Sequence, residues 1–350
     1  MKKVVFSLIV VLMTLAIVGC KKPTDESSSS NSSNGTAGDD AGGVNGAGGS
    51  GAGGSGGAGG SGGGNGAATP TRTKATGKIG EWEGVYEVGD IVFTDGSATP
   101  YSKTLTLTNE QKAAAIAIIF YKGTGLNTDV NYKEDTSKTR TLGIGLLHSE
   151  DVPRMPWCLK DDDNDIVAIG YYCEFATIEC TWSMPGGVRK FFGDKNGSDN
   201  LEQMSQLLKT KQANGEQLFG NAAVDDTNNS DLYPAFYFAK NYKDQAGSRV
   251  KDTAYETGWF LPSLAEIWKL CEVKDTVDAA SKLCGGSKFV LSGHDDEQYY
   301  ERPYYYWTST DTTMYRDEDC YYANIFSFLA EGEDSHDKSM DCYVMAIREF

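Results

Sequence analysis

A dense run of acidic side chains, Asp161-Asp162-Asp163-Asn164-Asp165, would have calcium binding as its chemistry. Its first, third and fifth residues have the alternate spacing of the first ligands in a helix-flanked calcium loop. Such a loop needs glycine at its sixth position and a bidentate glutamate at its twelfth, where this chain has Ile166 and Tyr172. The sequence therefore predicts a solvated acidic turn here and no metal site.

Eight cysteines are the next candidates for chemistry, and Cys20 stands apart from the other seven. No Cys-x-x-Cys pair occurs and only three histidines are present, which argues against zinc. Disulfides persist in an exported chain, and an odd number leaves at least one thiol free or paired between molecules. We expect two bridges that join neighbouring elements, Cys271 with Cys284 and Cys320 with Cys342. A third is expected among the remaining three, Cys158, Cys173 and Cys180.

A cluster of acidic and aromatic residues after His294 is our candidate ligand-binding patch. Tyrosine offers a rigid apolar ring with a polar tip, which suits contacts with sugars and with protein surfaces. The alternative is that alternate tyrosines of a strand face the core and the solvent in turn. The residues of the patch are Asp295, Asp296, Tyr299, Tyr304, Tyr305 and Tyr306.

No local motif places a nucleophile beside a base, so we expect no catalytic residues and no cofactor. The net charge of the chain limits which partners it can bind. Subtracting Lys2 and Lys3 from 32 basic residues leaves 30 against 49 acidic residues, a net charge of −19. Such a charge repels nucleic acid, anionic lipid headgroups and sulfated polysaccharides unless a local basic patch intervenes, and no run of lysine or arginine suggests one. We expect no nucleic-acid partner.

Residues 1–19 have the pattern of a bacterial signal peptide. Two lysines precede an apolar run from Val4 to Val18, which is shorter than the roughly 20 residues that a membrane span needs. The segment Ile17-Val18-Gly19-Cys20 then resembles the lipobox of bacterial lipoproteins. The resemblance implies cleavage before Cys20 and diacylglyceryl transfer to its thiol, so that the membrane is a partner through a lipid anchor. The alternative is an ordinary secretory signal with a chance cysteine.

Residues 20–77 have the composition of a flexible linker that begins with the lipidated cysteine. Serine dominates residues 27–33, and glycine with alanine and serine dominates residues 42–68. Such a stretch has almost nothing to bury and cannot offset its ordering entropy. A flexible coil of roughly 55 residues would span about 40 Å on average. We therefore expect a disordered tether that holds a globular head, residues 78–350, away from the membrane.

Strands dominate the first part of this head. Val85–Thr94 and Thr141–Leu147 have strand patterns. Lys112–Tyr121 begins with helix-forming alanines but ends in β-branched and aromatic residues, which favour a buried strand paired with Thr141–Leu147. Asp194–Asn200 predicts a turn that ends in the N-cap of a helix over Leu201–Gln212.

The stretch Gly258–Leu270 organises the second part, with two tryptophans, a proline and a helix start. Ser263 and Glu266 have the spacing of a capping box, and apolar residues then recur at helical spacing. The other elements expected are helices over Leu232–Tyr242 and Thr276–Leu283 and strands over Phe289–Ser292, Tyr304–Ser309, Tyr321–Leu329 and Tyr343–Arg348. Strands, then helices, then strands predict an α+β fold with antiparallel sheets, two or more helices and long loops.

Three separated segments resemble a known bacterial domain family. Gly258–Ile267 is similar to its G-W-x-L-P-[ST]-x-x-E-[LI] segment, Tyr306–Thr310 to its Y-W-[ST]-S-[ST] segment, and Ala346-Ile347-Arg348 to its final strand. The family includes the C-terminal domain of a collagen-like adhesin and is also called the major paralogous domain. Over residues 228–350 the resemblance implies a C-type-lectin-like fold that serves on bacterial surfaces in ligand binding or adhesion.

The sequence thus predicts a lipid-anchored protein of the bacterial cell envelope, expected in the outer membrane with its head at the cell surface. Its ligand would be a host or matrix protein or a glycan. An alternative is an enzyme of the sulfatase-modifying, formylglycine-generating type, because a segment of that family resembles Phe260–Ile267. That chemistry depends on paired C-terminal cysteines, for which only Cys320 and Cys342 are available. A structural envelope protein is the third interpretation.

Overall fold

The computed structural model describes residues 71–128, 133–158, 180–214, 233–289, 304–312 and 322–350. All of them belong to one unit of the chain, Gly66–Phe350. No helix in these ranges is long and apolar enough to cross a membrane. The signal peptide, Cys20 and most of the linker lie outside the described residues, and so does the acidic run that begins at Asp161.

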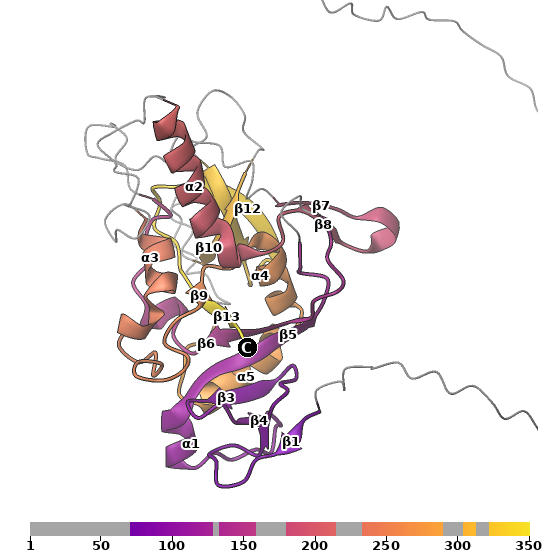
Figure 1. The fold of residues 1–350 in the computed structure, drawn as a ribbon, viewed down its shortest axis with the longest axis vertical. Helices are drawn as coiled ribbons and strands as arrows, with labels where there is room; N and C mark the ends of the chain where they lie inside the picture. The colour runs from indigo at the N-terminus through magenta and orange to yellow at the C-terminus, as the bar shows by residue number, and fades with distance from the viewer. Residues whose placement is uncertain (1–70, 129–132, 159–179, 215–232, 290–303, 313–321) are drawn as a thin grey trace, which may run out of the picture. The chain divides into compact units, whose positions relative to one another are not determined.

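An eight-stranded sheet has its strands in the order β1-β2-β4-β3-β5-β6-β13-β9 (Figure 1). Every neighbouring pair is antiparallel. The last strand of the chain, β13, lies between β6 and β9. It therefore joins the C-terminal residues to the stretch Gly258–Leu270, which we call the motif stretch. The strands are β1 (Thr73–Lys74), β2 (Trp82–Glu83), β3 (Asp90–Phe93), β4 (Ala98–Pro100), β5 (Ala115–Gly123), β6 (Arg140–Gly145), β9 (Trp259–Phe260) and β13 (Ile347–Glu349).

The segment with mixed helix and strand signals divides at Ala115. Before it lies α1 (Asn109–Ala114), which begins at a capping box. The Thr108 hydroxyl accepts from the Gln111 amide, and the Gln111 side chain accepts from the Thr108 amide. After it, β5 buries six consecutive residues, as a strand does when both faces of its sheet are covered. The predicted strand and its pairing with Thr141–Leu147 are confirmed.

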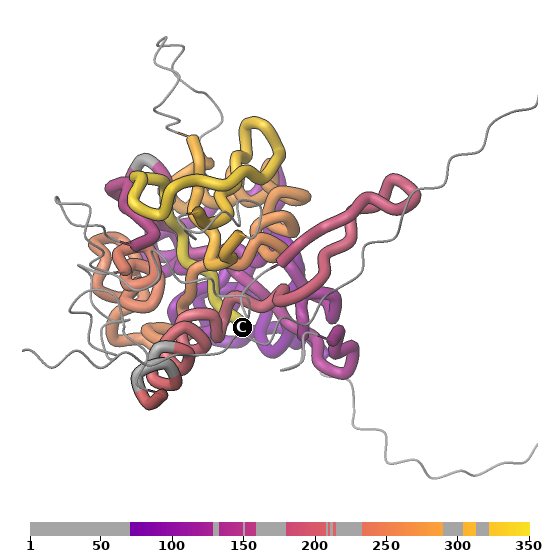
Figure 2. Tube along the Cα trace, turned by 90° about the horizontal axis from the view of Figure 1, so that it is seen from above, coloured from indigo at the N-terminus to yellow at the C-terminus, as the bar shows by residue number. Residues whose placement is uncertain are grey.

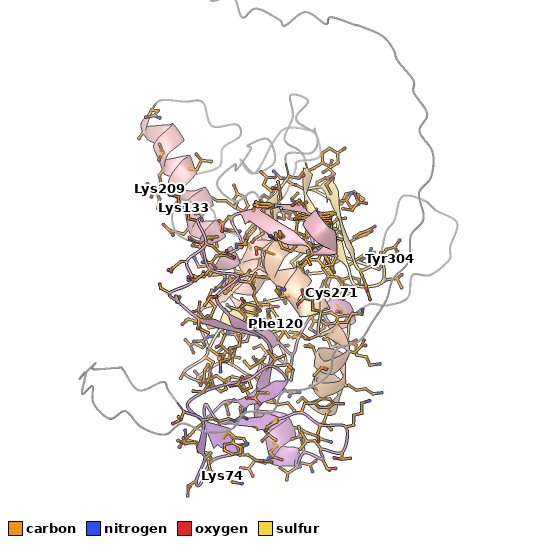
Figure 3. The ribbon with its side chains drawn as sticks, turned by 90° about the vertical axis from the view of Figure 1, so that its right-hand side faces the viewer. Lys74, Phe120, Lys133, Lys209, Cys271 and Tyr304 are labelled. Carbon is orange, nitrogen blue, oxygen red and sulfur yellow. The ribbon has the colours of Figure 1, made fainter. Side chains whose placement is uncertain are left out.

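Helices pack on the two faces of this sheet. One core cluster contains Ile116 and Ile119 of β5 with apolar residues of α2 and α3, and the other contains Ile118 and Phe120 with residues of α4 and α5. Figure 3 shows Phe120 in the interior. The predicted helices are confirmed, with ends that differ by no more than two residues. They are α2 (Asn200–Ala213), α3 (Pro234–Lys240), α4 (Leu264–Cys271) and α5 (Lys274–Leu283).

Two smaller sheets complete the fold. One holds β10 (Tyr305–Asp311), β11 (Tyr322–Ser327) and β12 (Gly332–Asp337), all antiparallel. The other is a hairpin of β7 (Cys180–Ser183) and β8 (Lys190–Gly193). The fold of the described chain is α+β with antiparallel sheets, as predicted.

Two strand predictions are wrong in extent. The strand predicted over Val85–Thr94 is limited to Asp90–Phe93. The strand predicted over Tyr343–Arg348 is wrong in extent, because the ladder begins only at Ile347. Before it, Cys342 forms an isolated β-bridge with Met155, and Tyr343 forms one with Tyr306 of β10. This segment connects β12 of the smaller sheet to β13 of the eight-stranded sheet. The strand predicted over Phe289–Ser292 lies outside the described residues except for Phe289, which is not in a strand.

Candidate functional site

The start of α4 is built as its sequence predicts. The Ser263 hydroxyl accepts a hydrogen bond from the Glu266 amide at 3.2 Å, and the Glu266 carboxylate accepts one from the Ser263 amide at 2.8 Å. The capping box is therefore confirmed. The same hydroxyl donates to the Lys195 carbonyl at 2.8 Å, which ties the segment before α2 to the start of α4.

Glu266 has a second role that its local sequence does not reveal. It is fully buried and pairs with the equally buried Arg140 of β6, with 2.8 Å between Oε1 and Nη1. Its other oxygen accepts from the Gly197 amide at 3.1 Å. Arg140 also reaches Glu349 of β13 at 3.2 Å. Burial acts to lower the pKa of Arg140, but the two carboxylates outweigh it and raise the pKa, so the guanidinium stays charged.

The segment that leads into α2 packs directly against this cap. A Cβ on Gly197 would lie 2.7 Å from the Ser263 nitrogen, so only glycine fits there. Asp194 accepts a hydrogen bond from the Gln203 side chain of α2 at 3.1 Å. Burial raises the pKa of Asp194 to about 7. These contacts fix the start of α2 beside the motif stretch.

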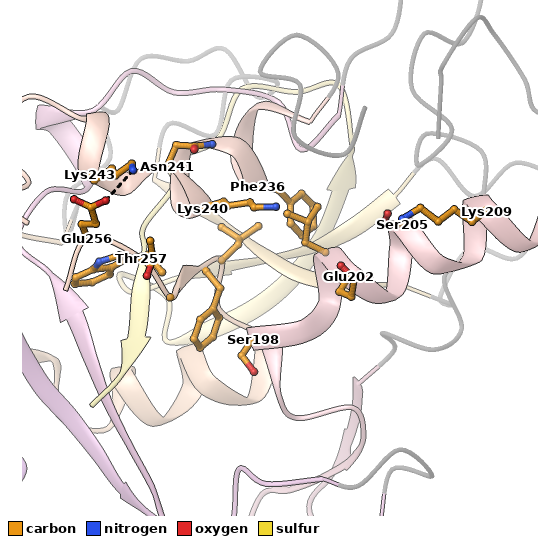
Figure 4. Close-up of a pocket in the computed structure, with 16 residues that line it drawn as sticks. Ser198, Glu202, Ser205, Lys209, Phe236, Lys240, Asn241, Lys243, Glu256 and Thr257 are labelled. Atoms are coloured by element: carbon orange, nitrogen blue, oxygen red, sulfur yellow. Dashed lines mark hydrogen bonds and ion pairs between the residues drawn. The ribbon is translucent and has the colours of Figure 1, made fainter. Parts of the chain in front are cut away.

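A cleft of about 550 Å³ opens between α2, α3 and the strand β9 (Figure 4). We call it the α2–α3 cleft. Its volume lies in the range of small-ligand sites. The motif stretch forms one wall through residues 258–261. The apolar part of the lining consists of Leu201, Phe236, Trp259, Phe260 and Leu261.

Charged side chains reach the α2–α3 cleft from both helices (Figure 4). Lys243 pairs with Glu256 across 3.1 Å, and each side chain is about one-third exposed. Lys209 and Lys240 are exposed, and neither has an ion-pair partner among the described residues. Glu202 of α2 completes the set. Sequence reasoning missed these residues, because none belongs to a motif and they come from three separate segments.

The predicted ligand-binding patch is wrong at its tyrosine end. Every residue of β10 is buried, with Tyr305 at 7 % exposure and Tyr306 at 0 %, so neither side chain can contact a ligand. Tyr304, labelled in Figure 3, is half-buried and stacks on Tyr305 with ring centroids 5.0 Å apart. The other members lie outside the described residues, namely Asp295, Asp296 and Tyr299.

The two disulfides predicted between Cys271 and Cys284 and between Cys320 and Cys342 are not formed in this structure. Cys271 ends α4 and Cys284 follows α5, and both are free buried thiols. The ten residues of α5 lie between them and span about 15 Å, whereas a bridge needs Cα atoms within roughly 7 Å. Cys342 is likewise a free buried thiol, so its pairing with Cys320, outside the described residues, is not formed. The third bridge cannot include Cys180, which is also free.

One histidine and one serine do meet in the interior. His148 Nδ1 lies 2.6 Å from the Ser149 hydroxyl, which contacts the Tyr306 hydroxyl. Ser149 has a φ of 59°, a left-handed conformation that costs a non-glycine residue strain. All three side chains are fully buried, and burial lowers the pKa of His148 to about 3. Because solvent does not reach them, the cluster serves packing in this conformation.

The α2–α3 cleft therefore holds the accessible chemistry best placed to bind a ligand. It offers ammonium groups and hydroxyls beside an apolar wall, a combination that binds a polar ligand by charge, hydrogen bonds and contact area. Within the described ranges no group of three or more histidine, cysteine or acidic side chains could hold a metal ion. Comparison with protein-family models, with curated proteins and with solved structures found no match.

Proposed function

We propose that the protein is a lipid-anchored binding module of the bacterial cell envelope and that its ligand occupies the α2–α3 cleft. The position of this cleft carries the proposal. One wall is Gly258–Leu261, the beginning of the segment that resembles the adhesin domain family. The cap at Ser263 and Glu266 holds that wall against the start of α2. The best-recognised part of the sequence thus supports the cleft.

The exposed lysines indicate what kind of ligand the cleft would hold. Lys209 and Lys240 carry ammonium groups without an ion-pair partner among the described residues, so they are available to an anionic group. The lining carries three lysines and two glutamates, and the Lys243–Glu256 ion pair leaves Lys209 and Lys240 against Glu202, a net positive charge. The Debye length is about 8 Å at physiological ionic strength, so this local charge acts on a bound ligand more strongly than the distant negative charge of the head. An acidic glycan, or an acidic segment of a matrix protein, would combine such a group with apolar surface.

The proposal includes a C-type-lectin-like fold for residues 228–350. Three arrangements support it. The motif strand β9 leads into α4 and α5, a second antiparallel sheet of β10, β11 and β12 follows, and the final strand β13 pairs with β9. An experimental structure of the head that did not superpose on lectin-like domains would contradict this assignment.

The sulfatase-modifying alternative has less support. Its chemistry needs an accessible pair of reactive cysteines near the C-terminus. Cys342 is 2 % exposed and free, and burial raises the pKa of its thiol far above the ordinary value. Such a thiol stays protonated and is a poor nucleophile or metal ligand. We therefore propose binding without catalysis.

An array of glycans and matrix proteins tests the proposal. The probe is residues 20–350 with Cys20→Ser, which removes the lipid and keeps the protein soluble. Bound ligands are then tested against Lys240→Ala. Its matched control is Lys282→Ala, because both lysines are exposed in the last turn of a short helix and only Lys240 lines the cleft. Ligands that bind both variants equally would contradict the assignment to the cleft.

Anchoring and exposure need their own test. Radiolabelled palmitate should enter the full-length protein and not the Cys20→Ser variant, because acylation requires the thiol. Proteinase treatment of intact cells should then remove the head from the anchored protein. A head that is protected on intact cells and cleaved only after lysis would contradict display at the cell surface.

A further inference from the structure

One hairpin carries most of the exposed large apolar side chains of the described residues. We call residues 180–193, which are β7, β8 and the turn between them, the hairpin arm. It extends away from the rest of the head in Figure 2. Six large apolar side chains are exposed in the described residues, and four of them lie on this arm. These are Trp182 (37 % exposed), Met184 (51 %), Val188 (61 %) and Phe192 (52 %).

The inner face of the hairpin arm is held by a stack of rings. Trp182 pairs with Phe191 across the two strands, so both side chains are on the same face. The Arg189 guanidinium lies between two indoles, 3.7 Å from the Trp182 ring centroid and 3.6 Å from that of Trp268 in α4. Arg189 also pairs with Glu333 at 2.8 Å. These contacts fix the arm to the body through cation–π attraction and charge.

The outer face presents a different row. Val188, Lys190 and Phe192 alternate with the inner residues and therefore point the opposite way. All three are exposed. The row places one cation between two apolar side chains, and the turn beyond it, Pro185–Gly187, is small and uncharged. The arm contains two basic residues and no carboxylate in a chain with a net charge of −17.

We propose that the outer face of the hairpin arm rests on the surface of a lipid bilayer. Phe192 and Val188 would enter the acyl boundary, while Trp182 stays on the inner face against Arg189. Lys190 would extend its ammonium to the lipid phosphates while its aliphatic part stays among the apolar side chains. Exposed apolar patches rimmed by polar groups mark such contact surfaces.

A second copy of the chain fits this face less well. A symmetric contact between two arms buries the same residues of both copies, so it would place the two Lys190 side chains in one small apolar interface. Like charges brought together there are unfavourable. A bilayer with anionic lipids has instead the opposite charge and no fixed shape to match. The inference is independent of the cleft, and it uses the proposed lipid anchor only as the device that keeps a membrane near.

Sedimentation with lipid vesicles tests the proposal on residues 20–350 with Cys20→Ser, so that no acyl chain contributes. The vesicles contain phosphatidylethanolamine with a minority of phosphatidylglycerol. We expect the protein to bind the vesicles. The double change Val188→Ser with Phe192→Ser should weaken binding about a hundredfold, because each side chain contributes on the order of tenfold when buried. Val88→Ser with Leu329→Ser is the matched control, since both residues are 45 % exposed elsewhere.

Further measurements separate the outcomes. Thermal unfolding should show both double variants folded, and Lys240→Ala should bind vesicles as the parent does. Absent vesicle binding, or equal losses in the two double variants, would overturn the proposal. It would also be overturned if the Val188 and Phe192 changes dissolved a dimer, seen by gel filtration, and left vesicle binding unchanged. If the protein bound vesicles but no ligand on the glycan and matrix-protein array, only the proposal of ligand binding in the α2–α3 cleft would be overturned.

Discussion

Glu266→Ala should destabilise the fold more than any surface change in the same helix. The substitution leaves the Arg140 guanidinium, which is fully buried, without its 2.8 Å partner. Removing one partner of a buried ion pair costs about 3–5 kcal/mol. It also removes the acceptor of the Ser263 and Gly197 amides. The contact with Glu349 remains, so the lower part of that range is expected.

Urea unfolding measures this cost. Against a total stability of about 5–15 kcal/mol, a loss near 3 kcal/mol moves the midpoint visibly. Glu272→Ala is the control, because Glu272 follows α4 directly and pairs with Lys269 at a side-chain exposure of 57 %. It should cost less than about 1 kcal/mol. The double change Glu266→Leu with Arg140→Met should recover part of the loss, because no buried charge is left unpaired. Equal losses of stability in Glu266→Ala and Glu272→Ala would show that the buried Arg140–Glu266 pair does not stabilise the fold.

Three further predictions concern buried titratable groups. The pKa of Asp194, about 7, lies above its ordinary value of 3.8, so the folded state binds more protons between these pH values and loses stability as the pH rises. Asp194→Asn should therefore gain stability relative to the parent by about 1.4 kcal/mol per pH unit at most in that window, measured by urea unfolding, and a flat difference would contradict it. The pKa of His148, about 3, lies below its ordinary 6.5, so stability should fall as the pH drops from 6.5 towards 3. His148→Gln should flatten this acid dependence in thermal melts, and an unchanged slope would count against it. Cys271, Cys284 and Cys342 should resist a thiol reagent in the native state and react in urea without reductant. If they stayed unreactive in urea until reductant was added, they would be bridged.

Local sequence patterns predict most of the helices and strands, but they do not predict which residues of different elements contact each other. The capping box at Ser263 and Glu266 is visible because its two members are three residues apart. The Arg140–Glu266 pair joins residues far apart in the chain, and no local pattern reports which buried charge meets which. The strand β12, Gly332–Asp337, was missed because it contains no large apolar residue and is held by pairing with β11.

The ligand-binding patch was predicted at the wrong place for the same reason, because its position depends on contacts between residues far apart in the chain. Tyrosines were assigned to a surface by composition, but the pairing of β10 with β11 places Tyr306 in the core. The proposed disulfides rested on order along the chain, which does not give the distance between Cys271 and Cys284. The α2–α3 cleft needs the packing of α2, α3 and β9, three elements that the sequence predicted separately.

Ligand binding in the α2–α3 cleft is tested most sharply by the affinity of an array-identified ligand for the Lys240→Ala and Lys282→Ala variants, measured by titration calorimetry. Lys240→Ala should weaken binding about tenfold, the loss expected when one charged hydrogen bond to the ligand is removed. Lys282→Ala should bind as the parent does. Equal affinity of both variants, or an array on which the head binds nothing, would contradict ligand binding in the α2–α3 cleft.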